Sequence, residues 1–352
     1  MSNPEHRGSF GILGSGSWAT ALAKILTDNN NTINWLVRTD AMSEAIITRK
    51  HNPNYLNSVV FDTSLLNLQT NVSKVVEESD YIIIATPSAY VIDTLSSLTK
   101  RDLEGKKMIS AVKGILPQEN ILLNDYLEKQ FAVDIKDYFT IMGPCHAEEV
   151  ASEKLSYLTF SGTDEPTAVE IASYFKTGYL NTVVNDDVYG VQFAAILKNI
   201  YALGAGIAHG LDYGDNFLSV LIANCADEMA GFLRNVGIHN IEVGKHEGED
   251  PVTHKRRANY AASVYLGDLL VTCYSLYSRN RTFGNMIGKG YSVKNAQLEL
   301  NMVAEGYNAS KCIYIINKNV KSEMPIAETI YQILWEQLSP EEGFEQIEET
   351  LV

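Results

Sequence analysis

The stretch SFGILGSGSWATALA, residues 9–23, joins a predicted strand to a predicted helix through a turn that contains two glycines. Its apolar start, Ser9–Leu13, predicts a buried β-strand, and Trp18–Thr27 predicts a helix. The turn between them carries Gly14, which permits a tight turn, and Gly16, which lets the backbone approach a pyrophosphate. The helix N-terminus behind this turn offers unpaired N–H groups and the positive end of the helix dipole. We therefore interpret the turn as a dinucleotide-binding site.

Downstream of this turn, the first half of the chain alternates short apolar runs with helical patterns. The runs Thr32–Val37, Tyr81–Ala85 and Lys107–Val112 predict strands, because continuous apolar runs are typical of parallel strands buried on both faces. Phe139–Met142 predicts a further strand, and Gln118–Lys129 predicts the helix before it. This alternation predicts a parallel sheet with helices on both faces. Two more strands, at 157–161 and 182–184, are expected on either side of a helix at 165–175.

After residue 185 the pattern becomes helical, which places a domain boundary between residues 185 and 192. We predict an α/β protein in which residues 1–188 form a Rossmann-type dinucleotide-binding domain. Residues 189–352 are expected to form an all-helical domain for substrate binding and catalysis. Its predicted helices cover residues 188–208, 216–236, 266–278, 292–300, 303–317 and 326–334.

Two segments of the second half are polar and are expected at the surface. Residues 238–259 contain Gly244, Gly248 and Pro251 and resemble an inserted loop. The histidines of this segment do not share a helix face, so we predict no metal site. The acidic tail at 339–349 is expected to be a solvated face.

Composition restricts the class of partner. The 352 residues carry a formal net charge of −15, which disfavours nucleic acid and anionic membrane surfaces as partners. No uninterrupted apolar run reaches the length of a membrane span, since the best candidate, residues 191–208, contains Lys198 and Asn199. The four cysteines show no paired spacing, so we expect a reduced, cytoplasmic compartment. A small-molecule partner is expected, and the oligomeric state is left open, with a homodimer as one option.

The residues that close the second predicted strand bear on cofactor choice. An NAD-specific enzyme presents Asp or Glu there to bind the ribose diol. This chain reads Trp35-Leu36-Val37-Arg38, and Arg38 suits a 2′-phosphate instead. Asp40 follows and is an alternative acceptor for a ribose hydroxyl. The alternative is that Arg38 is an ordinary surface arginine without a role in cofactor binding.

Lys198 is the first candidate for a catalytic group. It lies in a predicted helix of small and apolar residues, among them Ala194, Ala195, Ala202 and Ala205. A lysine on such a stripe is expected to be partly desolvated, which lowers its pKa and permits acid/base work near neutral pH. The alternative is a lysine that extends along the apolar surface and keeps its ammonium in water.

A polar stripe is predicted further along the chain. Asp268, Thr272, Ser275 and Arg279 have the spacing of one helix face. The opposite face carries Leu269, Leu270 and Leu276, so this helix is expected to pack on a core. We interpret the stripe as a site in which Asp268 orients Lys198 and a substrate hydroxyl, while Arg279 clamps a phosphate.

Two turns are expected at the carboxyl edge of the sheet, where ligands of open α/β sheets bind. Lys113 ends the run Ala111-Val112-Lys113-Gly114 after a predicted strand. Gly143-Pro144-Cys145-His146-Ala147 follows another. Each turn also has a simpler interpretation as a loop that ends a strand.

Taken together, these segments resemble the NAD(P)-dependent glycerol-3-phosphate dehydrogenase family of the bacterial biosynthetic type. The most specific match is Gly267-Asp268-Leu269 through Thr272-Cys273 to Ser278-Arg279-Asn280, with Lys198-Asn199 upstream. The resemblance spans nearly the whole chain. Its pieces are Gly14–Ala23, Trp35–Arg38, Ala111–Gly114, Gly143–Val150, Leu197–Gly206, Leu266–Gly284 and Val303–Ala309.

The resemblance implies reversible reduction of dihydroxyacetone phosphate to sn-glycerol 3-phosphate, with NADP(H) and/or NAD(H) as cofactor, for glycerophospholipid synthesis. It implies Lys198 as the proton donor and acceptor. The implied substrate contacts are Lys113, Gly143, Asp268, Ser278, Arg279 and Asn280. The implied cofactor contacts are Ser17, Trp18, Arg38, Lys113, Ala147, Arg279, Val303 and Glu305.

Three departures from the family pattern concern the site. Cys145 stands where the family usually has Ser or Thr, so substrate phosphate is expected to meet its backbone N–H rather than a hydroxyl. His146 replaces a usual aromatic residue, and the glycine-rich run before Gly267 reads Ala262-Ser263-Val264-Tyr265-Leu266.

Two other functions fit the residues: a related 3-hydroxyacid dehydrogenase with a carboxylate substrate, and a catalytically silent NAD(P)-binding sensor.

Overall fold

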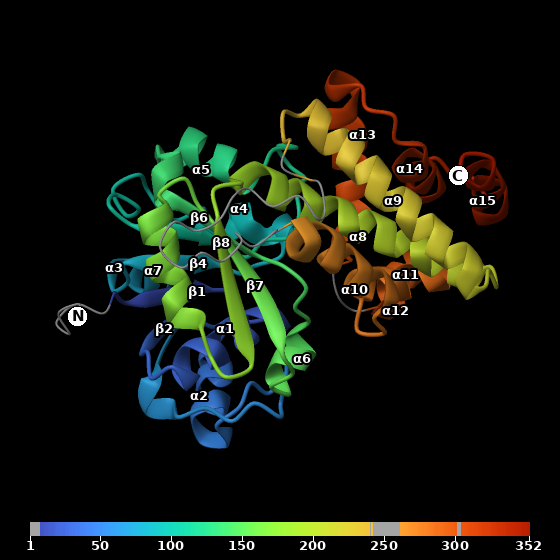
Figure 1. Cartoon of the computed structure of the whole chain (residues 1–352). Coiled ribbons are helices and arrows are strands. Elements are labelled where there is room, and N and C mark those ends of the chain that lie inside the picture. The colour runs from blue at the N-terminus through green and yellow to red at the C-terminus, as the bar shows by residue number, and fades with distance from the viewer. Residues whose placement is uncertain (1–7, 240, 242–260, 301–303) are drawn as a thin grey trace. The chain divides into compact units, whose positions relative to one another are not determined.

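The computed structural model describes residues 8–239, 241, 261–300 and 304–352 (Figure 1). These residues form two compact units. The first comprises residues 8–112 and 121–188, and the second comprises residues 113–120 and the described part of 189–352. The short segment Lys113–Asn120 therefore belongs to the helical unit, although it lies in sequence between strands of the first.

The first unit is built on an eight-stranded sheet in the order β3-β2-β1-β4-β5-β6-β7-β8. All neighbouring pairs are parallel except β6 and β7, which are antiparallel. The predicted parallel sheet is thus confirmed for its first six strands, and β7 and β8 add a parallel pair of reversed direction. The strands are β1 (Phe10–Leu13), β2 (Ile33–Leu36), β3 (Leu66–Gln69), β4 (Tyr81–Ile84), β5 (Lys107–Ser110), β6 (Tyr138–Met142), β7 (Ser156–Ser161) and β8 (Leu180–Asn185).

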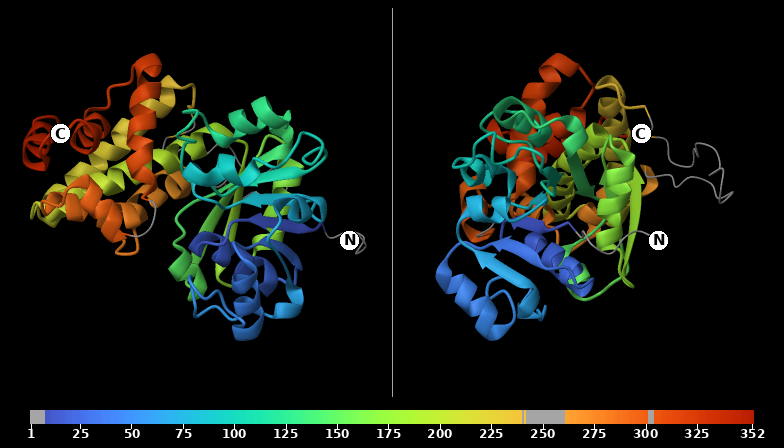
Figure 2. Two further views of the ribbon diagram at one scale, coloured as in Figure 1. Left: turned by 180° about the vertical axis from the view of Figure 1, so that it is seen from behind. Right: turned by 90° about the vertical axis from the view of Figure 1, so that its left-hand side faces the viewer.

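Helices surround this sheet, as the two further views in Figure 2 show. Helix α3 packs on β1 and β2, while α7 packs on β7 and β8. The run Tyr81–Ile84 has no exposed residue, as a strand covered on both faces requires. The helices of this unit are α1 (Ser17–Asp28), α2 (Asp40–Arg49), α3 (Val72–Glu77), α4 (Val91–Leu95), α5 (Leu123–Phe131), α6 (Ala147–Ala151) and α7 (Glu165–Phe175).

The order of the strands reverses at β1, which lies between β2 and β4. In register, Leu13 pairs with Leu36 on one side and Ile84 on the other. Ligands of open α/β sheets bind outside the carboxyl ends of the strands at such a reversal. Gly14 and Ala85 both lie at this edge, one directly after β1 and the other directly after β4.

The second unit is helical. It contains α8 (Val188–Gly210), α9 (Asp215–Asn235), α10 (Asp268–Tyr274), α11 (Arg279–Gly288), α12 (Val293–Leu300), α13 (Glu305–Val320), α14 (Pro325–Trp335) and α15 (Pro340–Glu348), with a π-helix at Ala261–Gly267. Among the described residues, α8 alone has the length and hydropathy to cross a membrane, but 94% of its apolar window is buried within the protein. Burial of this kind is typical of the central helix of a folded core.

Helices α8 and α11 approach so closely that glycine is required at their crossing. A Cβ on Gly206 would lie 2.1 Å from the Arg281 carbonyl oxygen, and one on Gly284 would lie 2.0 Å from the Leu203 carbonyl oxygen. Because neither contact involves a movable side chain, any larger residue would push the backbones apart. This contact packs α11 against the C-terminal half of α8.

The acidic tail is not simply a solvated face, as we expected from the sequence. It forms α15, in which Phe344 and Ile347 are fully buried while the glutamates Glu341 and Glu345 are exposed. The helix is therefore amphipathic. It packs against α14, and the Phe344 ring lies beside those of Tyr213 and Phe217.

Candidate active site

The nucleotide turn of the first unit needs both of its glycines for different reasons. Gly14 has φ +130°, and a Cβ there would lie 2.8 Å from the Ala85 carbonyl oxygen. A Cβ on Gly16 would meet no atom within 4 Å, so the structure leaves open space beside this residue. Gly16 is the N-cap of α1, and no acidic side chain lies in the first turn of that helix. The turn therefore fits an anionic pyrophosphate held by helix N–H groups. Ser17 and Trp18 follow as the first two residues of α1.

Arg38 lies just beyond the end of β2 and is exposed. Asp40 is the first residue of α2, and its Oδ1 accepts a hydrogen bond from Thr70 Oγ1 at 3.2 Å. Between these two described residues there is no ion pair. Asp40 thus binds a neighbouring hydroxyl rather than neutralising Arg38, which leaves the guanidinium accessible at the carboxyl edge of the sheet.

The loop after β6 is held by its own unit. Gly143 has φ +124°, and a Cβ there would lie 2.8 Å from the Tyr157 carbonyl oxygen. The Cys145 thiol donates to this same Tyr157 oxygen at 3.2 Å, and the Cys145 N–H donates to the Gly143 carbonyl at 2.9 Å. In this structure the N–H that we expected to serve substrate phosphate is used within the turn. His146 is the N-cap of the short helix α6, which Ala147 begins.

The centre of the second unit is an ion pair between Lys198 and Asp268. Lys198 extends from α8 and Asp268 begins α10, and their side chains are joined by a hydrogen bond from Nζ to Oδ1. Lys198 is 4% exposed, which rules out the alternative of an ammonium kept in water. Burial lowers the pKa of Lys198 to about 8, assisted by the positive charge of Lys113 and opposed by Asp268. A lysine of this pKa exchanges protons near neutral pH.

The other oxygen of Asp268 lies beside a second lysine. Lys113 Nζ is 3.9 Å from Asp268 Oδ2, a distance that permits an ion pair but no hydrogen bond. Within the described part of the chain, Oδ2 is buried and accepts no hydrogen bond. A buried carboxylate oxygen without a hydrogen bond is unfavourable in free energy. This oxygen can therefore accept a hydrogen bond from a hydroxyl group of a ligand.

A chain of amide hydrogen bonds runs beside this ion pair, and we did not predict it from the sequence. Asn199 Nδ2 donates to the Lys113 carbonyl at 2.8 Å, and Asn199 Oδ1 accepts from Asn280 Nδ2 at 2.9 Å. Asn280 Oδ1 in turn accepts from the Gly306 N–H at 2.9 Å. These bonds connect the segment Lys113–Asn120 to α8, α11 and the start of α13. Asn199, next to Lys198, thus fixes the backbone that carries Lys113.

The predicted single stripe from Asp268 to Arg279 is wrong. Helix α10 ends at Tyr274, and Ser275 is extended with φ −67° and ψ 136°. Ser275 Oγ accepts from the Tyr277 N–H at 3.1 Å, and Ser278 Oγ caps α11 by accepting from the Arg281 N–H at 3.3 Å. Serine side chains offer the backbone partners outside a helix, and here they end one helix and begin the next.

This break changes the surroundings of the residues that we assigned to the stripe. Thr272 is buried and its hydroxyl donates to the Asp268 carbonyl at 2.5 Å. Arg279 is exposed and opens α11. Leu270 and Leu276, expected to pack on a core, are 39% and 84% exposed. Leu269 is fully buried, as expected.

One of the predicted cofactor contacts, Glu305, lies at the start of α13. Glu305 is the first residue of this helix and is half-buried. Val303 lies outside the described residues, as do His246 and His254 of the expected insertion. The structure therefore brings Lys198, Asp268 and Lys113 together, with Asn280 linked to them through Asn199.

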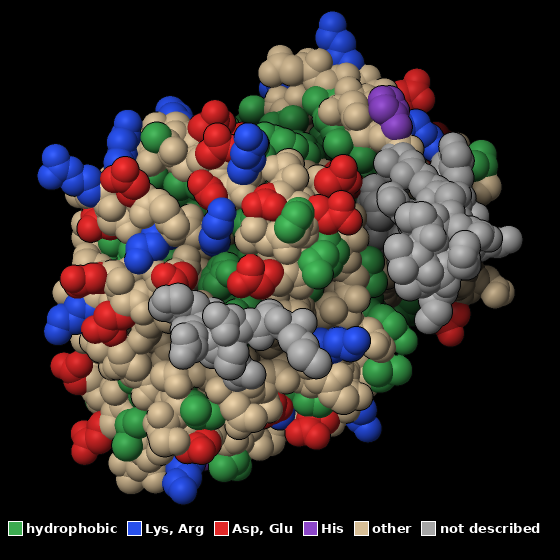
Figure 3. All heavy atoms as spheres, turned by 60° about the vertical axis from the view of Figure 1, so that its left-hand side comes forward, with side chains coloured by type: hydrophobic (Ala, Val, Ile, Leu, Met, Phe, Trp, Pro, Cys, Tyr) green, Lys and Arg blue, Asp and Glu red, His purple; other side chains and the backbone are tan. Residues whose placement is uncertain are grey.

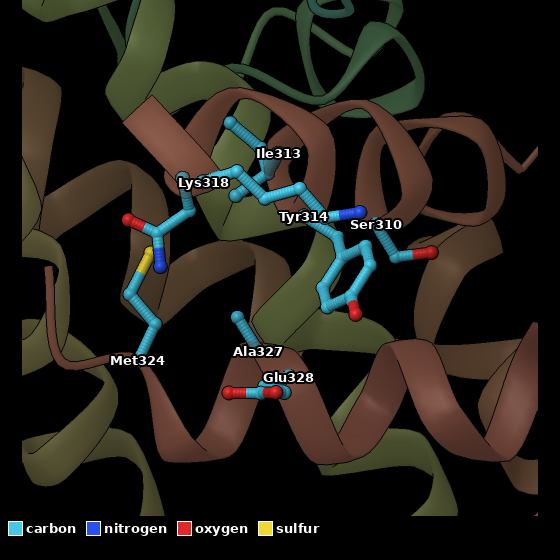
Figure 4. Close-up of a pocket in the computed structure, with 8 residues that line it drawn as sticks. Ser310, Ile313, Tyr314, Lys318, Met324, Ala327 and Glu328 are labelled. Atoms are coloured by element: carbon cyan, nitrogen blue, oxygen red, sulfur yellow. The ribbon is translucent and has the colours of Figure 1, made fainter. Parts of the chain in front are cut away.

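A pocket of about 220 Å³ lies elsewhere in the second unit, between α13 and α14 (Figure 4). Its polar groups include one lysine and one glutamate, and it contains no residue that we assigned to substrate or cofactor. On the face seen in Figure 3, acidic and basic side chains are interspersed without a large basic area. The pocket is lined by Ser310, Ile313, Tyr314, Asn317, Lys318, Met324, Ala327 and Glu328.

Comparison with known proteins identifies the family. The model of the NAD-dependent glycerol-3-phosphate dehydrogenase N-terminus matches residues 9–168, and that of the C-terminus matches residues 187–345. The glycerol-3-phosphate dehydrogenase of Bacillus subtilis, described as NAD(P)+-dependent, is 34% identical over 92% of this chain and 89% of the relative. Its counterpart in Chlorobium limicola is 32% identical over 92% of each chain.

A solved structure has the same fold. The glycerol-3-phosphate dehydrogenase of Coxiella burnetii superposes with a TM-score of 0.85 at 23% identity, over 97% of this chain and 99% of that one. The nucleotide turn, the strand order and the two family models all support the same family assignment. The chain belongs to the family of NAD(P)-dependent glycerol-3-phosphate dehydrogenases.

Proposed function

We propose that this protein catalyses the reversible reduction of dihydroxyacetone phosphate to sn-glycerol 3-phosphate. The observation that carries the proposal is the buried ion pair of Lys198 and Asp268, with Lys113 beside it. Reduction of a ketone requires a proton donor at the carbonyl oxygen, and the Lys198 ammonium is a buried group of suitable pKa. In the reverse direction the neutral amine accepts the proton of the substrate hydroxyl.

Asp268 has two functions in this proposal. Its Oδ1 holds the Lys198 ammonium in place, which keeps the charged form accessible despite burial. Its Oδ2, buried and without a hydrogen bond among the described residues, would accept a bond from a substrate hydroxyl. A carboxylate with one oxygen on the proton donor and one on the substrate would orient both.

Two cations of the second unit would bind the substrate phosphate. Arg279 is exposed at the N-terminus of α11, where the helix dipole adds to its positive charge. Its planar guanidinium can hold two phosphate oxygens at once. Lys113, held through its carbonyl by Asn199, supplies a second charge. A dianionic phosphate matches these cations better than the single charge of a carboxylate substrate does.

The cofactor would be held by the first unit. Residues Gly14–Ser17 fit its pyrophosphate, because Gly16 opens to free space and the first turn of α1 has no acidic side chain. When bound, the reduced nicotinamide supplies the hydride for the carbonyl carbon. Arg38 would pair with the 2′-phosphate of NADPH, which makes NADP(H) the favoured cofactor.

We further propose that the two parts of the chain have the separate functions expected from the sequence. Residues 1–188 would bind the dinucleotide, and residues 189–352 would bind substrate and carry the proton donor, together with Lys113 from the segment that joins the helical unit. The product would supply glycerophospholipid synthesis.

The test is oxidation of NADPH and NADH by the purified protein with dihydroxyacetone phosphate and, separately, with unphosphorylated 2- and 3-keto acids. Turnover with the phosphorylated ketone alone is the expected result. Turnover only with keto acids would replace this function with that of a 3-hydroxyacid dehydrogenase. Nucleotide binding without turnover on any substrate would favour a sensor.

A further inference from the structure

Three successive carbonyl groups of the nucleotide turn accept hydrogen bonds from the protein. Trp35 Nε1 donates to the Gly14 carbonyl at 2.7 Å, and Asn52 Nδ2 donates to the Ser15 carbonyl at 3.1 Å. The Gly16 carbonyl accepts from both the N–H and the hydroxyl of Thr20, each at 2.9 Å. The two bonds from Thr20 are ordinary for a helix start, whereas those from Trp35 and Asn52 come from side chains remote in sequence.

The two remote donors are themselves rigidly held. Trp35 and Asn52 are both fully buried. Trp35 lies on β2, and its ring meets that of Phe61 edge-on with centroids 5.6 Å apart. Asn52 Nδ2 also donates to Thr20 Oγ1 at 2.8 Å, and its Oδ1 accepts from the Asn54 N–H at 3.0 Å. Neither side chain can turn away without leaving a buried polar group unpaired.

Fixing a carbonyl also fixes the N–H of the next residue. In a planar trans peptide the two groups point in opposite directions. Holding the oxygens of Gly14 and Ser15 therefore turns the N–H groups of Ser15 and Gly16 away from Trp35 and Asn52. Within the described chain neither of these N–H groups donates a hydrogen bond. Both are left for an acceptor that the described residues do not provide.

We propose that Asn52 and Trp35 are positioning residues for the dinucleotide. By holding two carbonyls, they present the amides of Ser15 and Gly16 to the oxygens of the pyrophosphate. Without these bonds the turn could rotate its peptides, and the cofactor would have to restore the conformation at the expense of affinity. The proposal rests on the dinucleotide site of the proposed function, but not on the identity of the substrate.

The experiment compares Asn52→Ala and Trp35→Phe with the wild type, by titrating NADPH, ADP and adenosine against protein fluorescence or heat. ADP carries the pyrophosphate, and adenosine does not. We expect both variants to bind NADPH and ADP about tenfold more weakly, the loss of about one hydrogen bond. Adenosine affinity should change less than about twofold, because the proposed effect is confined to the pyrophosphate.

Asn34→Ala is the matched control. Asn34 is also buried in the first unit, and its Nδ2 also donates two hydrogen bonds, to the Glu78 carbonyl at 2.8 Å and Ser79 Oγ at 2.9 Å. Its side-chain hydrogen bonds are to Glu78, Ser79 and Asn67, not to the turn. We expect Asn34→Ala to lose stability in urea unfolding while keeping its affinity for ADP.

Steady-state kinetics provides a second readout. At saturating NADPH, Asn52→Ala should keep the wild-type kcat and the wild-type KM for the ketone, with only the KM for NADPH raised. If Asn52→Ala fails to fold, Trp35→Phe, which keeps a ring in the core, decides alone. The proposal is wrong if the variants bind ADP as the wild type does, if adenosine binding weakens equally, or if Asn34→Ala shows the same loss. Wild type that binds dinucleotide but reduces no ketone would contradict the proposed function only.

Discussion

Lys198 and Asp268 form an ion pair from which water is almost fully excluded, with 4% and 1% of each residue exposed. The lysine carries the lowered pKa, because burial opposes its charge more strongly than the carboxylate supports it. In the function that we propose, this lowered pKa lets Lys198 transfer a proton near neutral pH. Removing Asp268 alone would leave the Lys198 ammonium buried without its carboxylate partner, whereas removing Lys198 would leave Lys113 beside Asp268.

Replacement of Lys198 by Ala should abolish most turnover while nucleotide binding is kept. General acid/base groups contribute about 100- to 10,000-fold to rate, and we expect a loss in kcat of that size. The measurement is kcat with dihydroxyacetone phosphate, beside NADPH affinity by titration. Lys289→Ala, at an exposed lysine after α11, is the control and should keep the wild-type rate. A Lys198→Ala enzyme with more than about a tenth of the wild-type kcat would assign the proton to another group.

The two directions of the reaction should depend on pH in opposite ways. Ketone reduction needs the Lys198 ammonium, so its rate should fall as the pH rises through about 8. Alcohol oxidation needs the neutral amine, so its rate should rise over the same interval. Profiles of kcat/KM for each substrate check this, since they report the groups of the free enzyme. Parallel profiles in both directions would separate Lys198 from the proton transfer.

Arg279→Ala should raise the KM for dihydroxyacetone phosphate more than Arg279→Lys does. Lysine keeps the charge but loses the planar fork that holds two phosphate oxygens. A charge-assisted hydrogen bond contributes about 1.5–3 kcal/mol, equivalent to roughly 10- to 150-fold in kcat/KM. Arg234→Ala, at an exposed arginine near the end of α9, is the control. If Arg279→Ala keeps the wild-type KM and kcat, this residue does not bind the phosphate.

Arg38 should favour NADPH over NADH. The guanidinium is exposed beyond β2 and does not form an ion pair with Asp40. Its loss in Arg38→Ala should lower kcat/KM for NADPH by about tenfold or more, with little change for NADH. The comparison is kcat/KM for both cofactors in both proteins. A wild type that strongly prefers NADH, or a variant with unaltered use of NADPH, would contradict this assignment.

Glu228 should make stability depend on pH. It is buried on α9, where its carboxylate accepts from Tyr201 and from the N–H groups of Ile326 and Ala327 at the start of α14. Burial raises its pKa from 4.5 to about 7. Because the folded pKa is raised, the associated stability is present below pH 4.5 and is lost as the pH rises to about 7.

We therefore expect the unfolding free energy of the wild type, relative to that of Glu228→Gln, to be lower near pH 8 than near pH 5. The loss should be up to roughly 3 kcal/mol, at about 1.4 kcal/mol for each unit of pKa. Urea unfolding of both proteins at the two pH values measures it. A difference between them that does not change with pH would show that Glu228 does not titrate in this interval.

The features that the sequence predicted well are local or periodic. The turn at Gly14 and Gly16 follows from residues adjacent in sequence, and the burial of Lys198 follows from the small residues on one face of α8. The stripe from Asp268 to Arg279 failed because Ser275 and Ser278 offered the backbone hydrogen bonds that interrupt a helix, and a count of spacing ignores them.

The residues that the sequence did not reveal act over long separations. Asn52 meets the nucleotide turn from 37 residues away, and Asn199 meets the Lys113 carbonyl from 86 residues away. An asparagine has no periodic signature, and its partner is set by the fold. The amphipathic α15 was missed for a related reason, since its few apolar residues, Phe344 and Ile347, stand among many glutamates.

Because Lys113–Asn120 belongs to the helical unit, the chain cannot be truncated or recombined at residue 189 without separating residues that bind each other. A gene fragment that begins at residue 189 would lack Lys113, and Asn199 would lose the carbonyl that its amide binds. Exchange of the two halves between relatives at this boundary would also combine the Lys113–Asn120 segment of one parent with the Asn199 of the other. The halves are thus not interchangeable modules, and a workable chimaera must transfer this loop together with the helices.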